Sequence, residues 1–202
     1  MNIVEHIRLA FQYRQDPLYV KYLRGRKILD VGCGSGELLE RDPQNSTGVD
    51  INEKFVTSCR QRGLSAFNMS ALDLNFPDQS FDAVHAAQMI EHFSPSDAAI
   101  FLAEAARVIR PGGVVFLTTP GVKNVWGTFS HVRPYPPQAF RKLLSNKREA
   151  YIGERTLPLM LELGLGTRWY SSNRILFFAS RAIDILIPSA NPIGWTIVLR
   201  KR

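Results

Sequence analysis

The 202-residue sequence contains only two cysteines, Cys33 and Cys59, and only four histidines. Two cysteines build no disulfide framework, and neither residue type recurs at the short spacing typical of zinc sites. We therefore expect no metal, and a reducing compartment such as the cytoplasm. No apolar run reaches the ~18 residues of a membrane-spanning helix. Glu5, His6 and Arg8 stand where a secretory signal would be apolar, which disfavours a secreted protein.

Acidic side chains become scarce in the second half of the chain. Residues 1–101 contain 10 Lys or Arg and 13 Asp or Glu, whereas residues 102–202 contain 15 and 5; the formal net charge is +7. This asymmetry indicates that one part of the molecule meets an anionic partner, either RNA or a membrane surface to which the protein is peripheral. A solvated basic surface would give the same count.

Short apolar segments alternate with helical patterns between residues 26 and 120. Strands are predicted at 27–31, 46–51, 65–69, 81–86 and 114–119, and helices from Glu37, at 53–62 and at 95–109. Strands that alternate with helices favour an α/β fold, in which a mostly parallel, doubly wound sheet is covered on both faces.

The pattern is less regular after Pro120. It predicts a helix at 137–145, a strand at 148–156, helices at 158–165 and 172–187, and a final strand at 194–200. The helix at 172–187 is expected to turn one stripe inward and another outward. The inward stripe is Ile175, Ala179, Ala182, Ile183 and Leu186, and the outward one is Arg174, Phe177, Arg181 and Asp184. Such a helix either rests on an anionic surface or only covers the sheet.

A glycine-rich turn follows the first predicted strand. Gly32, Gly34 and Gly36 occupy alternate positions, which permits a tight turn and a close approach of ligand to backbone. The spacing is not that of a dinucleotide turn, and Glu37 would repel a pyrophosphate at the helix N-terminus. Asp50, which ends the second strand, can accept two hydrogen bonds from a ribose diol. A cationic nucleoside without phosphates fits both features, and S-adenosylmethionine is such a molecule.

Five segments resemble, in order, the motifs of class I S-adenosylmethionine-dependent methyltransferases. They are ILDVGCGSG at 28–36, GVDI at 48–51, FPDQSFD at 76–82, MIEH at 89–92 and RVIRPGG at 107–113. The resemblance covers roughly residues 26–145 and is closest to the type 11-like, small-molecule branch of the ubiquinone and menaquinone methyltransferases. It implies a Rossmann-like, seven-stranded, mostly parallel sheet with an antiparallel last strand, and S-adenosyl-L-methionine as cofactor.

The resemblance also assigns cofactor contacts residue by residue. Asp30 and the loop residues would hold the methionine portion, Asp50 would bind the ribose, and Ile51 would pack on adenine. The loop residues concerned are Gly32, Cys33, Gly34 and Gly36. Cys33 is either a small buried residue in a tight loop or a nucleophile.

The adenine motif departs from the family. Ser70 stands where an adenine-binding Asp is usual, so Ser70, the backbone of Ala71 or Leu72, or Asp73 would contact adenine. Ala87 and Gln88, just after the fourth strand, match positions that flank the sulfonium and its methyl group.

Two histidines are candidate catalytic residues. His131 resembles a loop histidine that faces the substrate in quinone-type relatives, and a neutral imidazole there would take a proton from the acceptor. It is otherwise a loop histidine bonded to backbone. His92, after Glu91, is part of either an acid–base pair or a helix cap.

One domain, 1–202, is expected. It comprises an N-terminal lid helix at 1–25 carrying Tyr13, Tyr19 and Tyr22, a cofactor-binding half at 26–120, and a substrate-side half at 121–202 with a variable helical insert at 157–190. Three functions follow: methyl transfer to O or N of a small-molecule acceptor, anionic or apolar; methyl transfer to tRNA or another macromolecule held by the basic half; and S-adenosylmethionine binding without catalysis. The protein would be a monomer or a homodimer.

Overall fold

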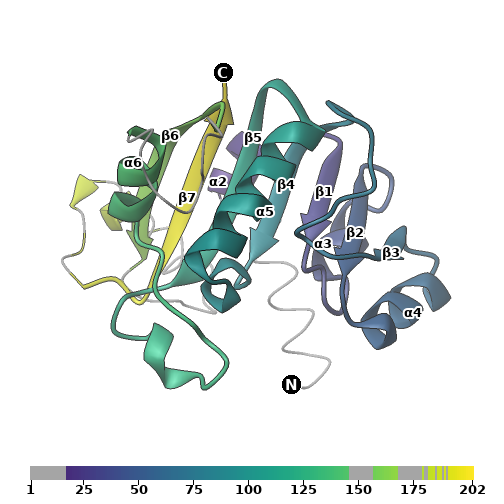
Figure 1. The fold of residues 1–202 in the computed structure, drawn as a ribbon, viewed down its shortest axis with the longest axis horizontal. Helices are drawn as coiled ribbons and strands as arrows, with labels where there is room; N and C mark the ends of the chain where they lie inside the picture. Colours follow the sequence, from purple (N-terminus) through teal and green to yellow (C-terminus); the bar gives the residue numbers. More distant parts are fainter. Residues whose placement is uncertain are drawn as a thin grey trace.

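The computed structural model describes residues 17–145, 157–167, 179, 182–184, 186–187, 189 and 191–202. A seven-stranded sheet runs through these residues in the order β3-β2-β1-β4-β5-β7-β6 (Figure 1). The strands are β1 (Ile28–Val31), β2 (Ser46–Asp50), β3 (Ala66–Asn68), β4 (Phe81–Ala87), β5 (Ile109–Pro120), β6 (Leu159–Thr167) and β7 (Gly194–Lys201). The pairs from β3 to β5 are parallel, and β7 is antiparallel to both β5 and β6. The expected α/β class with an antiparallel last strand is confirmed.

Helices follow the strands where the sequence supplies start signals. They are α2 (Pro17–Tyr22), α3 (Glu37–Arg41), α4 (Glu53–Gln61), α5 (Pro95–Val108) and α6 (Pro137–Ser145), with short 3₁₀ turns η1 (Ile90–His92) and η2 (Val125–Gly127). Asn52 caps α4 by accepting the Lys54 N–H at 3.1 Å, and Ser94 caps α5 by accepting the Asp97 N–H at 3.2 Å. None of the helices in the described ranges combines the length and apolar character needed to cross a bilayer.

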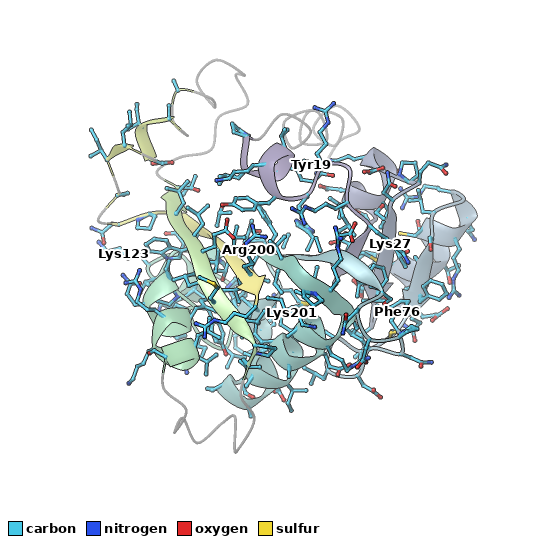
Figure 2. All side chains as sticks on the ribbon, turned by 90° about the horizontal axis from the view of Figure 1, so that it is seen from above. Tyr19, Lys27, Phe76, Lys123, Arg200 and Lys201 are labelled. Carbon is cyan, nitrogen blue, oxygen red and sulfur yellow. The ribbon has the colours of Figure 1, made fainter. Side chains whose placement is uncertain are left out.

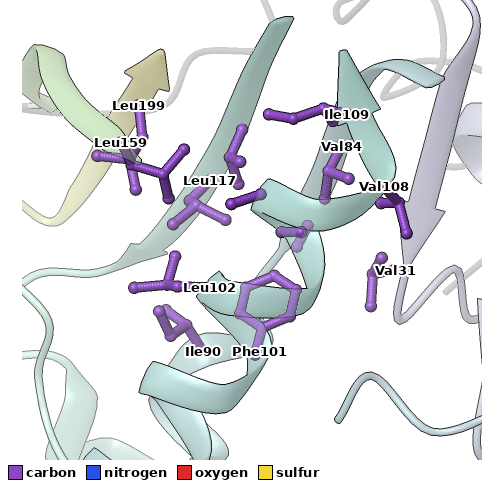
Figure 3. Close-up of a cluster of buried hydrophobic side chains, with 14 of the residues drawn as sticks. Val31, Val84, Ile90, Phe101, Leu102, Val108, Ile109, Leu117, Leu159 and Leu199 are labelled. Carbon is purple, nitrogen blue, oxygen red and sulfur yellow. The ribbon is translucent and has the colours of Figure 1, made fainter. Parts of the chain in front are cut away.

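The sheet buries both of its faces because successive side chains of a strand point to opposite sides. Leu29 of β1 belongs to the cluster beneath α5, with Phe101, Leu102 and Leu117 (Figure 3). Its neighbour Ile28 belongs to the cluster on the opposite face, which α2 and α3 cover. The carboxyl ends of the parallel strands are therefore held at one edge of a rigid core.

The tyrosines of α2 belong to this core. Tyr19 and Tyr22 of α2 are buried, and the Tyr22 ring lies 6.4 Å from that of Phe116 in β5 (Figure 2 labels Tyr19). Burial of such large apolar surfaces favours packing on the sheet over a movable cover. Tyr13 and the rest of the expected lid up to residue 16 lie outside the described residues.

The expected helix at 158–165 is wrong, because this segment forms β6 and pairs with β7. Its leucines at 159, 161, 163 and 165 recur at every second position, which is the period of a strand. Gly164 allows close contact with α6, since a Cβ there would lie 2.5 Å from the Cβ of Pro137. The part of the expected helical insert between 159 and 167 is thus part of the sheet.

The inward stripe predicted for 172–187 is also wrong for those of its residues that the structure describes. Ala182, Ile183 and Leu186 are exposed, whereas Asp184 is fully buried. The segment lies beside β6 in Figure 1, and its apolar stripe is left at the surface there. The predicted strand at 148–156, and Trp169, Tyr170, Arg174, Phe177 and Arg181, lie outside the described residues.

Candidate cofactor and acceptor site

The glycine loop leaves β1 in a conformation that other residues rarely adopt. Gly32, Gly34 and Gly36 have φ angles of 73°, 50° and 82°. The backbone N–H groups of Gly32 and Cys33 donate to the carbonyl of Val49 at 2.8 and 3.0 Å, which lays the loop against β2. A Cβ placed on Gly34 would meet nothing within 4 Å. This side of the loop therefore faces open space at the carboxyl edge.

Asp50 connects the end of β2 to this loop. Its Oδ2 accepts the Gly34 N–H at 2.9 Å, and its Oδ1 accepts the Asn52 N–H at 2.8 Å. The next side chain, Ile51, is 79% exposed. Asn68, which the sequence analysis missed, donates from Nδ2 to the carbonyls of Asp50 and Ile51 at 3.1 and 2.9 Å. A fixed carboxylate beside an uncovered apolar side chain and an open glycine face fits the adenosine and methionine portions of S-adenosylmethionine.

The turn after β3 contains the candidate adenine contacts. Ser70 Oγ accepts the Leu72 N–H at 3.1 Å, and the Asp73 N–H donates to the Ser70 carbonyl at 3.3 Å. The backbone N–H of Leu72 thus already donates a hydrogen bond within this turn, to Ser70. Ser70, Ala71 and Leu72 are half-buried, whereas Asp73 is exposed.

Asp30 has a partner that the sequence analysis missed. Its Oδ1 lies 2.6 Å from Nδ1 of His85, which is the register neighbour of Asp30 on β4, and both side chains are buried. The His85 ring stacks on Phe116 with centroids 5.9 Å apart. This contact fixes the rotamer of Asp30 at the base of the loop. Nε2 of His85 is buried and has no hydrogen-bond partner among the described residues.

Cys33 supports the loop by packing. It is buried, and a Cβ at Gly48 would lie 2.7 Å from its Sγ. Burial raises the pKa of the Cys33 thiol, which keeps it protonated and unreactive. These features favour the small buried residue over the nucleophile. Arg62 also holds the loop, since it hydrogen-bonds the Ser35 carbonyl and the Glu40 carboxylate; no local sequence signal pointed to it.

The carboxyl end of β4 carries Ala87 and Gln88. Gln88 has a φ of 52°, which is strained for a residue with a side chain. Its N–H donates to the Thr118 carbonyl at 2.8 Å, and its Nε2 donates to Thr118 Oγ1 at 3.3 Å. Bonds to β5 therefore hold this unfavourable conformation in place.

The structure brings Glu91, His92 and His131 together. Glu91 is fully buried; its Oε2 accepts a hydrogen bond from Thr119 Oγ1 at 3.1 Å, while Oε1 has no partner in the described part of the chain. Burial raises the pKa of Glu91. The rings of His92 and His131 lie 4.8 Å apart, edge to face.

The two histidines are oriented by backbone carbonyls. Nδ1 of His131 lies 2.6 Å from the Val125 carbonyl, and Nδ1 of His92 lies 3.1 Å from that of Ser130. A carbonyl only accepts, so each Nδ1 carries the proton and each Nε2 keeps a lone pair. Ligand-type atoms of Glu91, His92 and His131 lie within 4.8 Å of one another. Such a set can accept a proton or hold a divalent metal, and sequence spacing did not reveal it because His131 comes from another loop.

An apolar cavity of about 140 Å³ lies between η1, α5 and α6, and its lining residue Ile90 precedes Glu91 in the sequence. Its wall includes Ile90, Leu102, Phe140 and Leu143, with Arg133 and Lys142 among the lining residues. Tyr135 also lines it and donates from its hydroxyl to the Phe93 carbonyl at 2.9 Å. The cavity suits an apolar group attached to an anionic or polar one.

Residues 29–117 match the family model of a methyltransferase domain. The chain is 39% identical to a fatty-acid O-methyltransferase of Mycolicibacterium smegmatis over 48% of this chain and 38% of that protein. It is 32% identical to a ubiquinone biosynthesis O-methyltransferase of Rhizobium leguminosarum over 53% and 45%, and 37% identical to a probable tRNA methyltransferase 9B of Mus musculus over 46% and 21%. The chain thus spans less than half the length of each of these relatives.

The whole described architecture is similar to that of solved methyltransferases. The crystal structure of an S-adenosylmethionine-dependent methyltransferase from Archaeoglobus fulgidus superposes with a TM-score of 0.68 at 22% identity, over 96% of this chain and 94% of that one. At such low identity the structural similarity shows the fold alone, and the evidence for the family is the sequence match over residues 29–117. Residues 29–117 therefore form a methyltransferase domain of the S-adenosylmethionine-dependent class, and the described fold is that of solved enzymes of this class.

Proposed function

We propose that this chain transfers a methyl group from S-adenosylmethionine to an oxygen or nitrogen atom of a small, partly apolar acceptor in the cytoplasm. The observation that carries the proposal is the bond between the Gly34 amide and the Asp50 carboxylate, which aligns the open glycine face with exposed Ile51. Asp50 accepts the ribose hydroxyls, Ile51 covers adenine, and the loop with Asp30 holds the methionine portion.

When bound, the cofactor supplies an electrophilic methyl group. The chain must hold the acceptor atom in line with that group at ~3–3.5 Å, an orientation worth ~7–11 kcal/mol. Gln88, at the end of β4, contributes to this positioning. Nε2 of His131 takes the proton from an acceptor hydroxyl or amine as the new bond forms, and the Val125 carbonyl keeps the imidazole in the required tautomer.

The cavity between η1, α5 and α6 supports an acceptor with an apolar part. Its wall from η1, α5 and α6 is apolar, and Arg133 can pair with a carboxylate or phenolate. The fatty-acid and ubiquinone O-methyltransferase relatives are named for acceptors of this kind. We infer that the acceptor joins a short apolar group to an ionisable oxygen or nitrogen.

Transfer of radiolabelled methyl groups tests the proposal. Medium-chain fatty acids, alkyl phenols and alkyl amines would each be incubated with labelled S-adenosylmethionine and extracted. We expect label in the extract of one class, and loss of that label with an Asp50→Ala variant. Cofactor binding without transfer to any of these acceptors would reject this acceptor class and favour binding without catalysis.

A second candidate, methylation of tRNA, is supported by the basic half of the chain and by the tRNA methyltransferase relative. It predicts incorporation of label into bulk tRNA, and a binding constant that falls steeply with salt. If tRNA becomes labelled and none of the small acceptors does, this second candidate replaces the first.

A further inference from the structure

The loop between β5 and α6 presents four large apolar side chains to solvent. Val122, Trp126, Phe129 and Val132 are 47%, 63%, 107% and 48% exposed. We call residues 121–133 the aromatic loop. It follows the carboxyl end of β5, carries His131, and its turn η2 projects beyond the sheet at the bottom of Figure 1. Exposed apolar surface of this extent marks an interaction site.

The exposure is a consequence of how the aromatic loop is anchored. At its start, the Gly121 N–H donates to the Ile193 carbonyl at 2.8 Å; at its end, the Val132 N–H donates to the Glu91 carbonyl at 2.8 Å. In the middle, Val125 is fully buried and its carbonyl is bonded to His131. The fold therefore buries one face of the loop and directs Trp126 and Phe129 outward.

The charged residues within the aromatic loop and α6 have one sign. Residues 121–145 contain Lys123, Arg133, Arg141 and Lys142, and neither Asp nor Glu. Lys123 lies at the periphery of the molecule in Figure 2. Aromatic side chains prefer the interface between lipid headgroups and acyl chains, and cations nearby add attraction to anionic lipids.

We propose that the aromatic loop docks on an anionic lipid bilayer, with Trp126 and Phe129 inserted at the headgroup level and Lys123 facing lipid phosphates. RNA also binds cationic side chains and stacks on aromatic rings, but it provides no apolar environment for the exposed aliphatic side chains of Val122 and Val132. A bilayer accommodates all four apolar side chains. Docking here would bring His131 close to an acceptor dissolved in the membrane; that last point rests on the proposed function, whereas the docking itself does not.

Co-sedimentation with vesicles tests the docking without any assay of activity. The full chain would be mixed with vesicles of phosphatidylcholine, or of phosphatidylcholine and phosphatidylglycerol in equal parts, at low and physiological salt. We expect binding to the anionic vesicles, reduced about tenfold or more in a Trp126→Ser/Phe129→Ser variant. Met160→Ser is the matched control. Met160 is 42% exposed at the start of β6, where it pairs with Arg200, and the aromatic loop leaves the sheet at the other end of the strands. Lys123→Glu should weaken binding to the anionic vesicles only.

Quenching by brominated lipid shows which residue inserts. The other two tryptophans are Trp169 and Trp195, so vesicle-dependent quenching should disappear in Trp126→Phe while sedimentation persists. The proposal is overturned if the wild-type chain fails to sediment with anionic vesicles at either salt, or if the double variant sediments as well as the wild type. It is also overturned if the double variant loses affinity for tRNA but not for vesicles.

Discussion

The carboxylate of Asp50 accepts the backbone N–H of Gly34 at 2.9 Å, although the two residues lie on different connections of the sheet. The bond joins the end of β2 to the middle of the glycine loop. Both groups proposed to contact the cofactor, the ribose-binding carboxylate and the loop backbone, are thereby fixed relative to each other before any ligand arrives. Such preorganisation reduces the entropy lost on binding.

Replacing Gly34 by Val should abolish most of the affinity for S-adenosylmethionine, because the side chain would occupy the space open in front of the loop. Gly63, at the end of α4, is a matched control: it also has a positive φ, of 74°, and open space around its Cβ position. Both variants carry a strain of ~1–3 kcal/mol. Calorimetric titration should show cofactor binding lost in Gly34→Val and kept in Gly63→Val; equal affinities would refute the loop geometry.

Replacing Gly48 by Ala should destabilise the fold by ~1–3 kcal/mol, as overpacking does in a dense core. The new methyl group would lie 2.7 Å from both Cys33 Sγ and Leu39 Cδ1. Urea unfolding of Gly48→Ala, Cys33→Ala and the double variant measures the coupling. The double variant should recover part of the loss; strict additivity would show that Cys33 does not set the packing beneath the loop.

Replacing His131 by Gln should lower turnover of an identified acceptor by ~10²–10⁴, the usual contribution of a general base. Affinity for the cofactor should remain unchanged. Ser130→Ala is the control, since only the carbonyl of Ser130 contacts His92. An unchanged rate in His131→Gln would exclude the proposed base.

Glu91 should make stability depend on pH. Burial raises its pKa in the folded state above the ordinary 4.5, so the folded chain binds more protons than the unfolded chain in this window. This contribution is greatest below pH 4.5 and is lost as the pH rises through the folded pKa. Thermal unfolding would be measured between acidic and neutral pH. The free energy of unfolding of Glu91→Gln, relative to that of the wild type, should increase as the pH rises. A constant difference would mean that Glu91 has no raised pKa.

Local signals were sufficient for the half of the molecule that holds the cofactor candidates. Glycines at 32, 34 and 36 indicate a turn that needs positive φ angles. Asp50, at the end of a predicted strand, indicates the carboxyl edge of the sheet. The position of Asp50 beside the loop then follows from parallel pairing of β1 and β2. These features need only neighbouring residues to be read.

Contacts between distant segments could not be predicted in the same way. Asp30 meets His85 because β4, and not only β2, pairs with β1, and His131 meets His92 because the aromatic loop folds back on η1. The Leu-rich segment at 158–165 is short enough to be read with either period, and pairing with β7 decides for the strand. In each case the deciding partner lies far away in the sequence.

Calorimetric titration of S-adenosylmethionine into the wild-type chain, Asp50→Ala and Asp82→Ala tests the central claim most directly. Asp82 is a suitable control, because it is a similarly half-buried carboxylate that accepts the Lys27 N–H and pairs with Arg110 at the start of β4. Charge-assisted bonds of ~1.5–3 kcal/mol each predict a loss of tenfold or more in Asp50→Ala. We predict saturable binding to one site in the wild type and in Asp82→Ala; no binding by the wild type, or equal affinity in Asp50→Ala, would contradict the account.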